Sequence, residues 1–303
     1  MIAIEFGGSR MRIKPQLTKK STGRYFYLPS VIIISVLVFF PMLQALMMSF
    51  QTGSPVDMQF SGLSNYIRML SDATFKKAAL NTSLYLLVQV PVMILLSMVI
   101  SVLLNQKNLK FRSFFRIAIF LPCITSLVSY SLIMKSLFME SGLVNTILLN
   151  SHLISEPIMW LTHPVWAKVL IIISITWRWT GYNMIFFLSG LQNIDPSIYE
   201  AADIDGTTEW QKFFRITVPM LKPIILFTTI TSTIGTLQLF DEVVNITNGG
   251  PANATMTLSQ YIYNLSYKFT PNFGYAAAIS FVIVIAIVLL TMIQMKLGGD
   301  RDD

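Results

Sequence analysis

The residue types that usually carry catalysis are sparse in this chain. The sequence has one cysteine, Cys123, and two histidines, His152 and His163, whose spacing matches neither a metal site nor a nucleophile with its base. It also has no Gly-x4-Gly-Lys-[Ser/Thr] loop, which would hold the phosphates of ATP. We therefore expect no catalysis, no metal and no bound cofactor on this chain, so that any ATP and Mg²⁺ must be bound by other subunits.

Polar side chains inside apolar stretches are the other residues that point to a function. They gather near the middle of the stretch 165–188 and again along 223–240. A polar group costs free energy in lipid, so those that are present usually face a cavity or another helix. The candidate pathway residues are Thr176, Arg178, Trp179, Tyr182, Asn183, Ser232 and Thr236, with Leu239 on the same helical face and Asp241 at the outer end of the second stretch.

These side chains suit a sugar, which needs hydrogen bonds for its hydroxyls and flat aromatic faces for its rings. Two other roles remain open, because Ser and Thr also hydrogen bond between membrane helices and Trp and Tyr also anchor at interfaces. Arg178 has three possible partners: a backbone carbonyl, a second subunit or an anionic substrate. Asp241, and Glu242 beside it, are equally compatible with a solvated position.

The composition excludes a water-soluble domain. Of the 303 residues, 53% are hydrophobic and only 12% are charged, whereas soluble domains carry about 25% charged residues. A helix needs roughly 20 apolar residues to cross a bilayer. Six stretches qualify, and they predict an all-α polytopic membrane protein with six transmembrane helices at about 28–50, 80–104, 117–138, 165–188, 223–240 and 275–295.

The net charge of +7 does not indicate nucleic-acid binding, because the distribution of the basic residues follows the membrane topology. Basic residues cluster in the amino-terminal arm and at 107–116, while 139–164 has no Lys or Arg. Cytoplasmic loops carry the excess of Lys and Arg, so both termini are expected inside the cell. The predicted organisation is a cytoplasmic arm (1–27), one six-helix permease domain (28–296) and a cytoplasmic tail (297–303).

The cytoplasmic loop 189–222 has the signals of two short helices. Asp195 is placed to cap the first, with Pro196 at its first helical position. Gly206 can adopt the left-handed conformation that ends this helix. Thr208 and Gln211 form a capping box for a second helix, and they are followed by residues expected to share one face and by a closing proline: Trp210, Phe213, Phe214, Thr217 and Pro219.

This loop also carries the pattern E-A-A-x3-G-x9-I-x-V-P. It resembles the cytoplasmic docking loop of permease subunits in bacterial ATP-driven importers, with Val218 where leucine is commoner. An isolated piece of the pattern would suit any helix-turn-helix connection, but the full spacing favours docking. The resemblance implies that the ATPase is coupled through Glu200, Ala201, Ala202, Asp203, Gly206, Ile216 and Pro219.

The likeness covers nearly the whole chain and is to the carbohydrate branch of the type I ATP-binding-cassette importer permeases. One segment looks specific to sugar transport and is expected outside as a docking or gating loop: Asn248, Gly249, Gly250 and Pro251. The resemblance implies a bacterial plasma-membrane location. It also implies a second homologous permease, two ATP-binding subunits, an extracellular substrate-binding protein, a carbohydrate substrate and membrane lipid as partners.

A free-standing secondary transporter driven by an ion gradient is the alternative function. Such a carrier is expected to have acidic residues within its spans and, commonly, two repeated halves. The six stretches show no acidic residue near a centre, and the chain shows no internal repeat. The sequence therefore favours the importer subunit.

Overall fold

The computed structural model describes residues 19–54, 57–106 and 108–299. The chain forms two compact units, Met1–Met47 and Met48–Asp303. Most of the predicted cytoplasmic arm (1–27) and the end of the predicted tail (297–303) lie outside the described residues.

The first unit is built on one apolar helix. Its helix starts as α1 (Lys19–Ile34), passes through a wider π-helical turn η1 (Ser35–Phe39) and continues into α2 (Phe40–Ser49). Apolar side chains along it are exposed, among them Phe26 at 81% and Leu37 at 68%. A helix that is apolar all round must be covered by lipid or protein. The 24 residues Phe26–Ser49 are apolar enough to cross a bilayer, in agreement with the first predicted span.

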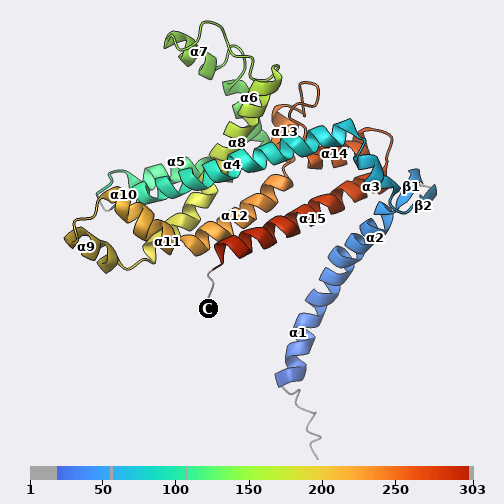
Figure 1. The fold of residues 1–303 in the computed structure, drawn as a ribbon, viewed down its shortest axis with the longest axis horizontal. Helices are drawn as coiled ribbons and strands as arrows, with labels where there is room; N and C mark the ends of the chain where they lie inside the picture. Colours follow the sequence, from blue (N-terminus) through green and yellow to red (C-terminus); the bar gives the residue numbers. More distant parts are fainter. Residues whose placement is uncertain (1–18, 55–56, 107, 300–303) are drawn as a thin grey trace, which may run out of the picture. The chain divides into compact units, whose positions relative to one another are not determined.

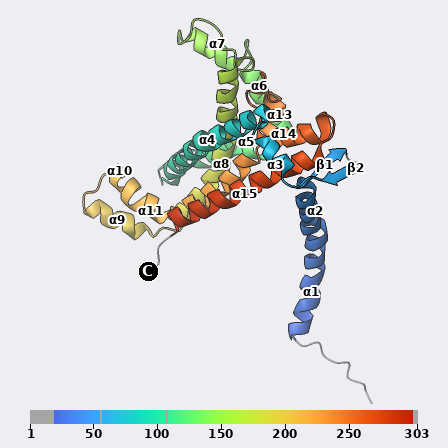
Figure 2. The ribbon, with the colours of Figure 1, turned by 45° about the vertical axis from the view of Figure 1, so that its right-hand side comes forward.

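The second unit holds the remaining elements, and four of its helices are long: α4 (Ala73–Asn105), α8 (Pro164–Gln192), α12 (Lys222–Leu237) and α15 (Phe273–Gly298). Figures 1 and 2 show α9 to α11 together at one end of this unit and α3, α13 and α14 at the other. The shorter elements are β1 (Gln51–Ser54), β2 (Asp57–Phe60), α3 (Ser64–Met69), α5 (Arg112–Ile124), α6 (Leu127–Leu137), α7 (Leu143–Asn150), α9 (Pro196–Ile204), α10 (Glu209–Lys212), η2 (Phe213–Thr217), α11 (Val218–Met220), α13 (Asp241–Ile246), α14 (Leu258–Tyr263) and η3 (Asn264–Lys268).

A small β-hairpin departs from the all-α prediction. Strands β1 and β2 pair antiparallel, with Gln51 opposite Phe60 and Gly53 opposite Met58. Gly53 has a φ of 130°, and a Cβ there would overlap the carbonyl oxygen of Asp57. Only glycine permits this close approach of the backbone. A turn former between short polar runs is a hairpin signal, but a search for apolar stretches does not detect it.

The apolar helices account for three spans without ambiguity: Phe26–Ser49, Ala73–Asn105 and Phe273–Gly298. Two bent helix pairs add two further spans if each pair crosses the membrane as one unit. They are Arg112–Ile124 with Leu127–Leu137, bent by 104°, and Glu209–Met220 with Lys222–Leu237, bent by 69°. The remaining predicted span, 165–188, lies within the 29 residues of α8. This helix is long enough to cross but less apolar, because polar side chains occupy its middle.

The close packing of α4 against α8 builds the centre of the second unit. Small residues allow this approach, since Ser97 Oγ donates to the Thr180 carbonyl at 3.1 Å and Ser101 Oγ donates to the Met184 carbonyl at 2.9 Å. On another side of α8, a Cβ at Gly181 would overlap the carbonyl oxygen of Ile119 in α5. Small residues and interhelical hydrogen bonds are the usual means by which membrane helices associate.

The N-terminal end of α4 is fixed by one carboxylate. Asp72 caps the helix by accepting from the backbone amides of Thr74 and Phe75, at 2.8 and 3.2 Å. Its second oxygen accepts from the hydroxyls of Tyr261 and Tyr275, at 2.6 and 2.7 Å. One side chain therefore joins α4, α14 and α15.

We predict that Asp72→Asn lowers the thermal unfolding midpoint by about 2–4 °C at neutral pH. Burial alone would raise the pKa of Asp72, but the four hydrogen bonds outweigh it and lower that pKa. The stabilisation is thus present above the unfolded pKa of about 3.9 and is lost as the pH falls through the folded value.

The measurement is the midpoint of wild type and Asp72→Asn against pH in detergent. Their difference should shrink below about pH 4. Tyr275→Phe should also lower the midpoint, whereas Tyr267→Phe should not, because Tyr267 is 75% exposed. A difference that persists at low pH would contradict the role of the Asp72 charge.

Candidate functional site

The first short helix of the loop 189–222 is formed as predicted. Helix α9 begins after Asp195, whose carboxylate accepts from the Ser197 amide at 2.9 Å. This hydrogen bond lowers the pKa of Asp195. The helix ends at Ile204, and Gly206 follows with a φ of 72°. No atom lies within 4 Å of a Cβ built on Gly206, so its backbone conformation, and not crowding, requires glycine.

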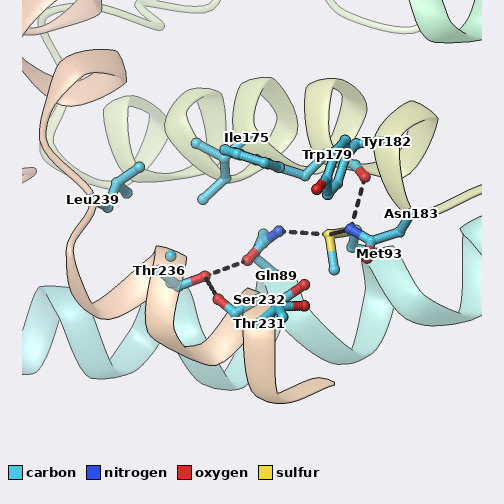
Figure 3. Close-up of a pocket in the computed structure, with 11 residues that line it drawn as sticks. Gln89, Met93, Ile175, Trp179, Tyr182, Asn183, Thr231, Ser232, Thr236 and Leu239 are labelled. Atoms are coloured by element: carbon cyan, nitrogen blue, oxygen red, sulfur yellow. Dashed lines mark hydrogen bonds between the residues drawn. The ribbon is translucent and has the colours of Figure 1, made fainter. Parts of the chain in front are cut away.

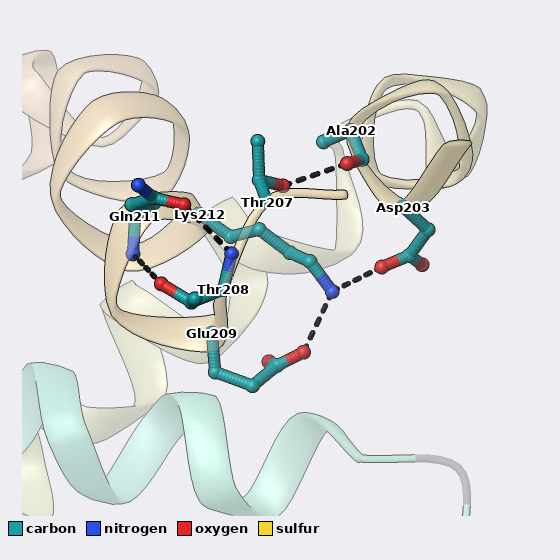
Figure 4. A network of polar contacts seen from close by, with 7 residues as sticks. All are labelled: Ala202, Asp203, Thr207, Thr208, Glu209, Gln211 and Lys212. Atoms are coloured by element: carbon teal, nitrogen blue, oxygen red, sulfur yellow. Dashed lines mark hydrogen bonds and ion pairs between the residues drawn. The ribbon is translucent and has the colours of Figure 1, made fainter. Parts of the chain in front are cut away.

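The second short helix begins with the predicted capping box. The Thr208 amide donates to Gln211 Oε1 at 2.8 Å, and the Gln211 amide donates to Thr208 Oγ1 at 3.3 Å. Lys212 then reaches back across the turn to pair with Asp203 of α9 and, at 2.6 Å, with Glu209 (Figure 4). These bonds raise the pKa of Lys212, that to Asp203 most. They join two helices that share little apolar surface.

Two details of this second helix differ from the prediction. Trp210 and Phe214 are 74% and 59% exposed, whereas Thr217 is buried and Phe213 half-buried, so the four residues do not share one face. Trp210 and Phe214 stack on each other, with ring centroids 6.0 Å apart, whereas Thr217 lies at the end of the π-helical turn η2. Pro219 does not close the helix either: α11 runs through it to Met220, and the bend comes before α12.

The remaining predicted docking residues divide by exposure. Glu200, Ala201 and Asp203 are exposed at α9, while Ala202 is buried and accepts from the Thr207 hydroxyl at 2.7 Å. Ile216 is half-buried against the body of the unit. A groove beside α9 is lined by Glu200 and Asp203 and by Asn105, Arg112 and Tyr199.

A cavity lies between α4, α8 and α12 (Figure 3). It contains about 420 Å³ of empty space, part of it open to solvent. Trp179 and Tyr182 form one aromatic wall, with ring centroids 5.6 Å apart and planes at 90°. Thr236 Oγ1 donates to Gln89 Oε1 at 3.0 Å on the opposite side. The cavity thus presents aromatic faces and hydrogen-bonding groups together.

Six of the nine predicted pathway residues line this cavity: Trp179, Tyr182, Asn183, Ser232, Thr236 and Leu239. The other three do not. Thr176 and Arg178 are buried elsewhere on α8, and Asp241 is exposed at the start of α13.

Sequence reasoning missed the contribution of α4, since Gln89 and Met93 also line the cavity. The Asn183 amide donates to Met93 Sδ at 3.3 Å, and the Gln89 amide donates to the same sulfur at 3.2 Å. Gln89 could have been found by the criterion applied to α8 and α12, because it is a polar residue within an apolar stretch.

The two acidic residues at the start of α13 have different environments, although the sequence suggests a shared position. Asp241 is exposed, but only 4% of Glu242 is exposed. Helix α13 packs on α6 and α8, and this brings Glu242 into the electrostatic neighbourhood of Arg178 and Tyr130. Glu242 lies beyond the end of α12 and in none of the candidate spans, in agreement with the prediction that no acidic residue lies near a span centre.

The predicted outer loop, Asn248–Gly249–Gly250–Pro251, is a tight turn fastened to α4. Asn248 and Gly249 have φ values of 50° and 79°. Just after the turn, Lys77 Nζ donates to the Ala252 carbonyl at 2.7 Å, and Asn81 donates to the Asn253 and Met256 carbonyls at 3.2 and 3.0 Å. The loop is thus held in one shape against the start of a membrane helix.

We predict that Lys212→Met makes amide hydrogen exchange at 201–205 about two- to fivefold faster, because the ion pairs that join α9 to α10 are lost. Exchange followed by mass spectrometry measures this. Arg215→Met is the matched control, since Arg215 is an exposed cation of the same segment. Equal acceleration in both variants would show that Lys212 has no special role.

Comparisons with known proteins extend over nearly the whole chain. The profile of a family described as "Binding-protein-dependent transport system inner membrane component" matches residues 18–297. The "Lactose transport system permease protein LacF" of Rhizobium radiobacter is 53% identical over 281 residues, covering 92% of this chain and 94% of that protein. The "Arabinooligosaccharides transport system permease protein AraP" of Bacillus subtilis is 36% identical, covering 93% and 90%.

The fold also has a solved counterpart. One chain of a bacterial ABC transporter involved in the import of the acidic polysaccharide alginate superposes with a TM-score of 0.79 at 24% identity, covering 94% of this chain and 98% of that one. A second structure of the alginate transporter, with a periplasmic protein bound to an alginate pentasaccharide, gives the same TM-score at 23% identity.

Proposed function

This chain belongs to the family of binding-protein-dependent transport system inner membrane components, as a permease subunit of a sugar ABC importer, and we propose that it docks the ATPase through loop 189–222. The resemblance to the carbohydrate branch is thereby confirmed. The chain is a multi-pass inner-membrane protein and a transport component without an ATPase domain. The family assignment removes the support for an ion-driven secondary carrier.

One observation carries the docking proposal: the loop joins the two helices that form the cavity wall. Helix α8 ends at Gln192, α9 follows at Pro196, and α12 begins at Lys222. Any displacement of α9 must therefore pull on both α8 and α12. The exposed Glu200 and Ala201 offer an anion and a small, closely approachable surface, which suits an arginine-bearing partner.

Internal bonds make the loop stiff enough to transmit such a displacement. Lys212 joins α10 to α9 through Asp203, and the hydroxyls of Tyr199 and Thr217 lie 3.0 Å apart, which joins α9 to η2. We infer that closure of two ATPase subunits moves α9 and shifts the cavity between inward- and outward-facing states, each with its own affinity for substrate.

The cavity supports a carbohydrate substrate. Trp179 and Tyr182 offer ring faces, while Gln89, Asn183 and Ser232 offer hydrogen-bonding groups. Two relatives are named for lactose and for arabinooligosaccharides. We propose that a second, homologous permease completes the pathway, that an extracellular binding protein delivers the sugar, and that both termini of this chain lie in the cytoplasm.

We predict that Glu200→Arg lowers the amount of ATPase recovered with the purified permease by at least about tenfold, because a charge is reversed at the contact. Gly206→Val should have a similar effect, because a β-branched residue does not tolerate a φ of 72°. Co-purification measures both.

Two variants are matched controls for docking. Gly206→Asn should retain the ATPase, because asparagine adopts the left-handed conformation at helix ends. Glu156→Arg, on the segment predicted to face outward, should also retain it. Full ATPase recovery and transport with Glu200→Arg would refute docking by this loop.

For the cavity, we predict that Trp179→Ala lowers lactose uptake by reconstituted importer roughly tenfold, because it removes an aromatic wall. Trp177→Ala is the control, since Trp177 is the next tryptophan on α8 and does not line the cavity. Equal losses in the two variants would contradict a substrate role for Trp179. Uptake of arabinooligosaccharides in the same vesicles would test the range of sugars.

A further inference from the structure

The short helix α3 presents an exposed apolar stripe. Leu63, Ile67 and Leu70 are exposed at 60%, 65% and 74%. The Ile67 amide donates to the Leu63 carbonyl and the Leu70 amide to the Ile67 carbonyl, both at 3.0 Å, so the three residues belong to one helical run. Their spacing of four and three residues places them on one face. Such a stripe must be covered by lipid or by protein.

The opposite face of α3 fixes the direction of the stripe. Asn65 is 1% exposed, and its side-chain amide donates to the carbonyls of Ser49 and Gln51 at 2.9 and 2.8 Å. The Tyr66 hydroxyl donates to Ser49 Oγ at 2.8 Å. Met69 is 4% exposed and belongs to an apolar core cluster. Because these contacts hold the opposite face against the unit, the stripe points away from it.

Helix α3 lies at the level where membrane helices end. Ser49, to which the buried face of α3 bonds, is the last residue of the apolar helix Phe26–Ser49. Helix α3 also packs on α15 (Figures 1 and 2). There the guanidinium carbon of Arg68 lies 4.3 Å from the ring centroid of Tyr275, near the start of the span Phe273–Gly298. The headgroup zone is about 5 to 8 Å thick, and contact with two span ends places α3 in it.

The charges beside the stripe suit a phospholipid. Residues 61–80 contain three cations, Arg68, Lys76 and Lys77, and one acid, Asp72. Arg68 is exposed, whereas the Asp72 carboxylate already accepts four hydrogen bonds. A cation beside an apolar helix face is typical of helices that lie in the membrane interface, where basic residues attract anionic lipids.

The size of the stripe favours lipid over a partner protein. It consists of three aliphatic side chains, whereas a stable protein interface uses about 20–30 residues from each partner. Acyl chains can cover so small a surface, because they fit around single side chains and need no matching surface. The position at the span ends and the adjacent cation agree with the same occupant.

We propose that α3 is a binding surface for anionic phospholipid: Leu63, Ile67 and Leu70 insert among the acyl chains, and Arg68 binds the phosphate. The surface is separate from the sugar cavity and from the loop 189–222. The bound lipid lies beside the junction at which Asp72 joins α4, α14 and α15. It therefore covers a place where several helix ends are already held together.

Photoreactive lipids test the insertion of the stripe. The purified importer assembly is placed in phosphatidylcholine nanodiscs that contain phosphatidylcholine with a diazirine either next to the glycerol or at the chain end, and mass spectrometry locates the label. The probe next to the glycerol should label Ile67 at least about fivefold more than Ser64, because Ser64 lies about a quarter turn from the stripe. Ser64 is also exposed, which makes it the matched control.

Leu87 is the positive control for the chain-end probe, because it is 73% exposed on α4, which is long enough to span a membrane. If Leu87 is labelled and the stripe is labelled by neither probe, water or protein covers the stripe and the proposal is wrong. If the chain-end probe labels Ile67 as strongly as Leu87, the stripe is deep in the bilayer, which contradicts the placement at its surface.

The role of Arg68 is tested by the headgroup of the probe. Photoreactive phosphatidylglycerol should label Ile67 about threefold more than the matching phosphatidylcholine at low salt, because the cation attracts the anionic lipid. Arg68→Gln should remove this preference and keep the labelling by phosphatidylcholine. A displaced α3 would lose both, so the two readouts separate binding from a structural effect.

Two variants are controls for the charge. Arg68→Lys keeps the cation and should retain most of the preference. Arg215→Gln removes an exposed cation from η2 in the loop 189–222 and should retain all of it. Equal labelling by the two lipids in the wild type, or an unchanged preference in Arg68→Gln, would refute phosphate binding by Arg68.

Discussion

The scarcity of hydrogen-bonding partners inside a bilayer constrains every polar residue of this protein. A serine or threonine in such a helix must bond to its own helix or to a neighbour. Both solutions occur here: Ser97 bridges from α4 to α8, and Thr229 of α12 donates back to the Ile225 carbonyl at 2.6 Å. At the cavity, the side-chain amides of Gln89 and Asn183 donate to the sulfur of Met93 instead. The function is located where polar residues gather among apolar ones.

The loop 189–222 obeys a different constraint, because its helices are too short to form a core. Helices α9 and α10 have nine and four residues, and isolated helices of that length are not stable in water. They are held by local devices: the Asp195 cap, the capping box of Thr208 and the ion pairs of Lys212. Together with the connection to α8 and α12, these devices suit a part that transmits force.

Part of the architecture follows from local patterns, and those parts were predictable. The three long apolar helices and the two bent pairs were visible from hydropathy, and the caps of α9 and α10 from residue type and spacing, because each cap depends on residues within four positions. The hairpin at 51–60 and the π-helical turn η2 were not predicted, since each changes backbone geometry without changing hydropathy. The bend of 104° between α5 and α6 comes just after Pro122, and proline is a usual cause of such kinks.

The sequence by itself determined the class of protein, the two short helices of loop 189–222 and the polar helices that form the cavity, because lipid penalises polar groups wherever they occur and the loop pattern is contiguous. Only the tertiary structure decided which faces of those helices meet. It placed Trp179 at the cavity and buried its neighbour Arg178 away from the cavity, and it added Gln89 from α4. These outcomes depend on how helices rotate and approach one another, and that is set by small residues such as Ser97 and Gly181, whose partners lie far away in the sequence.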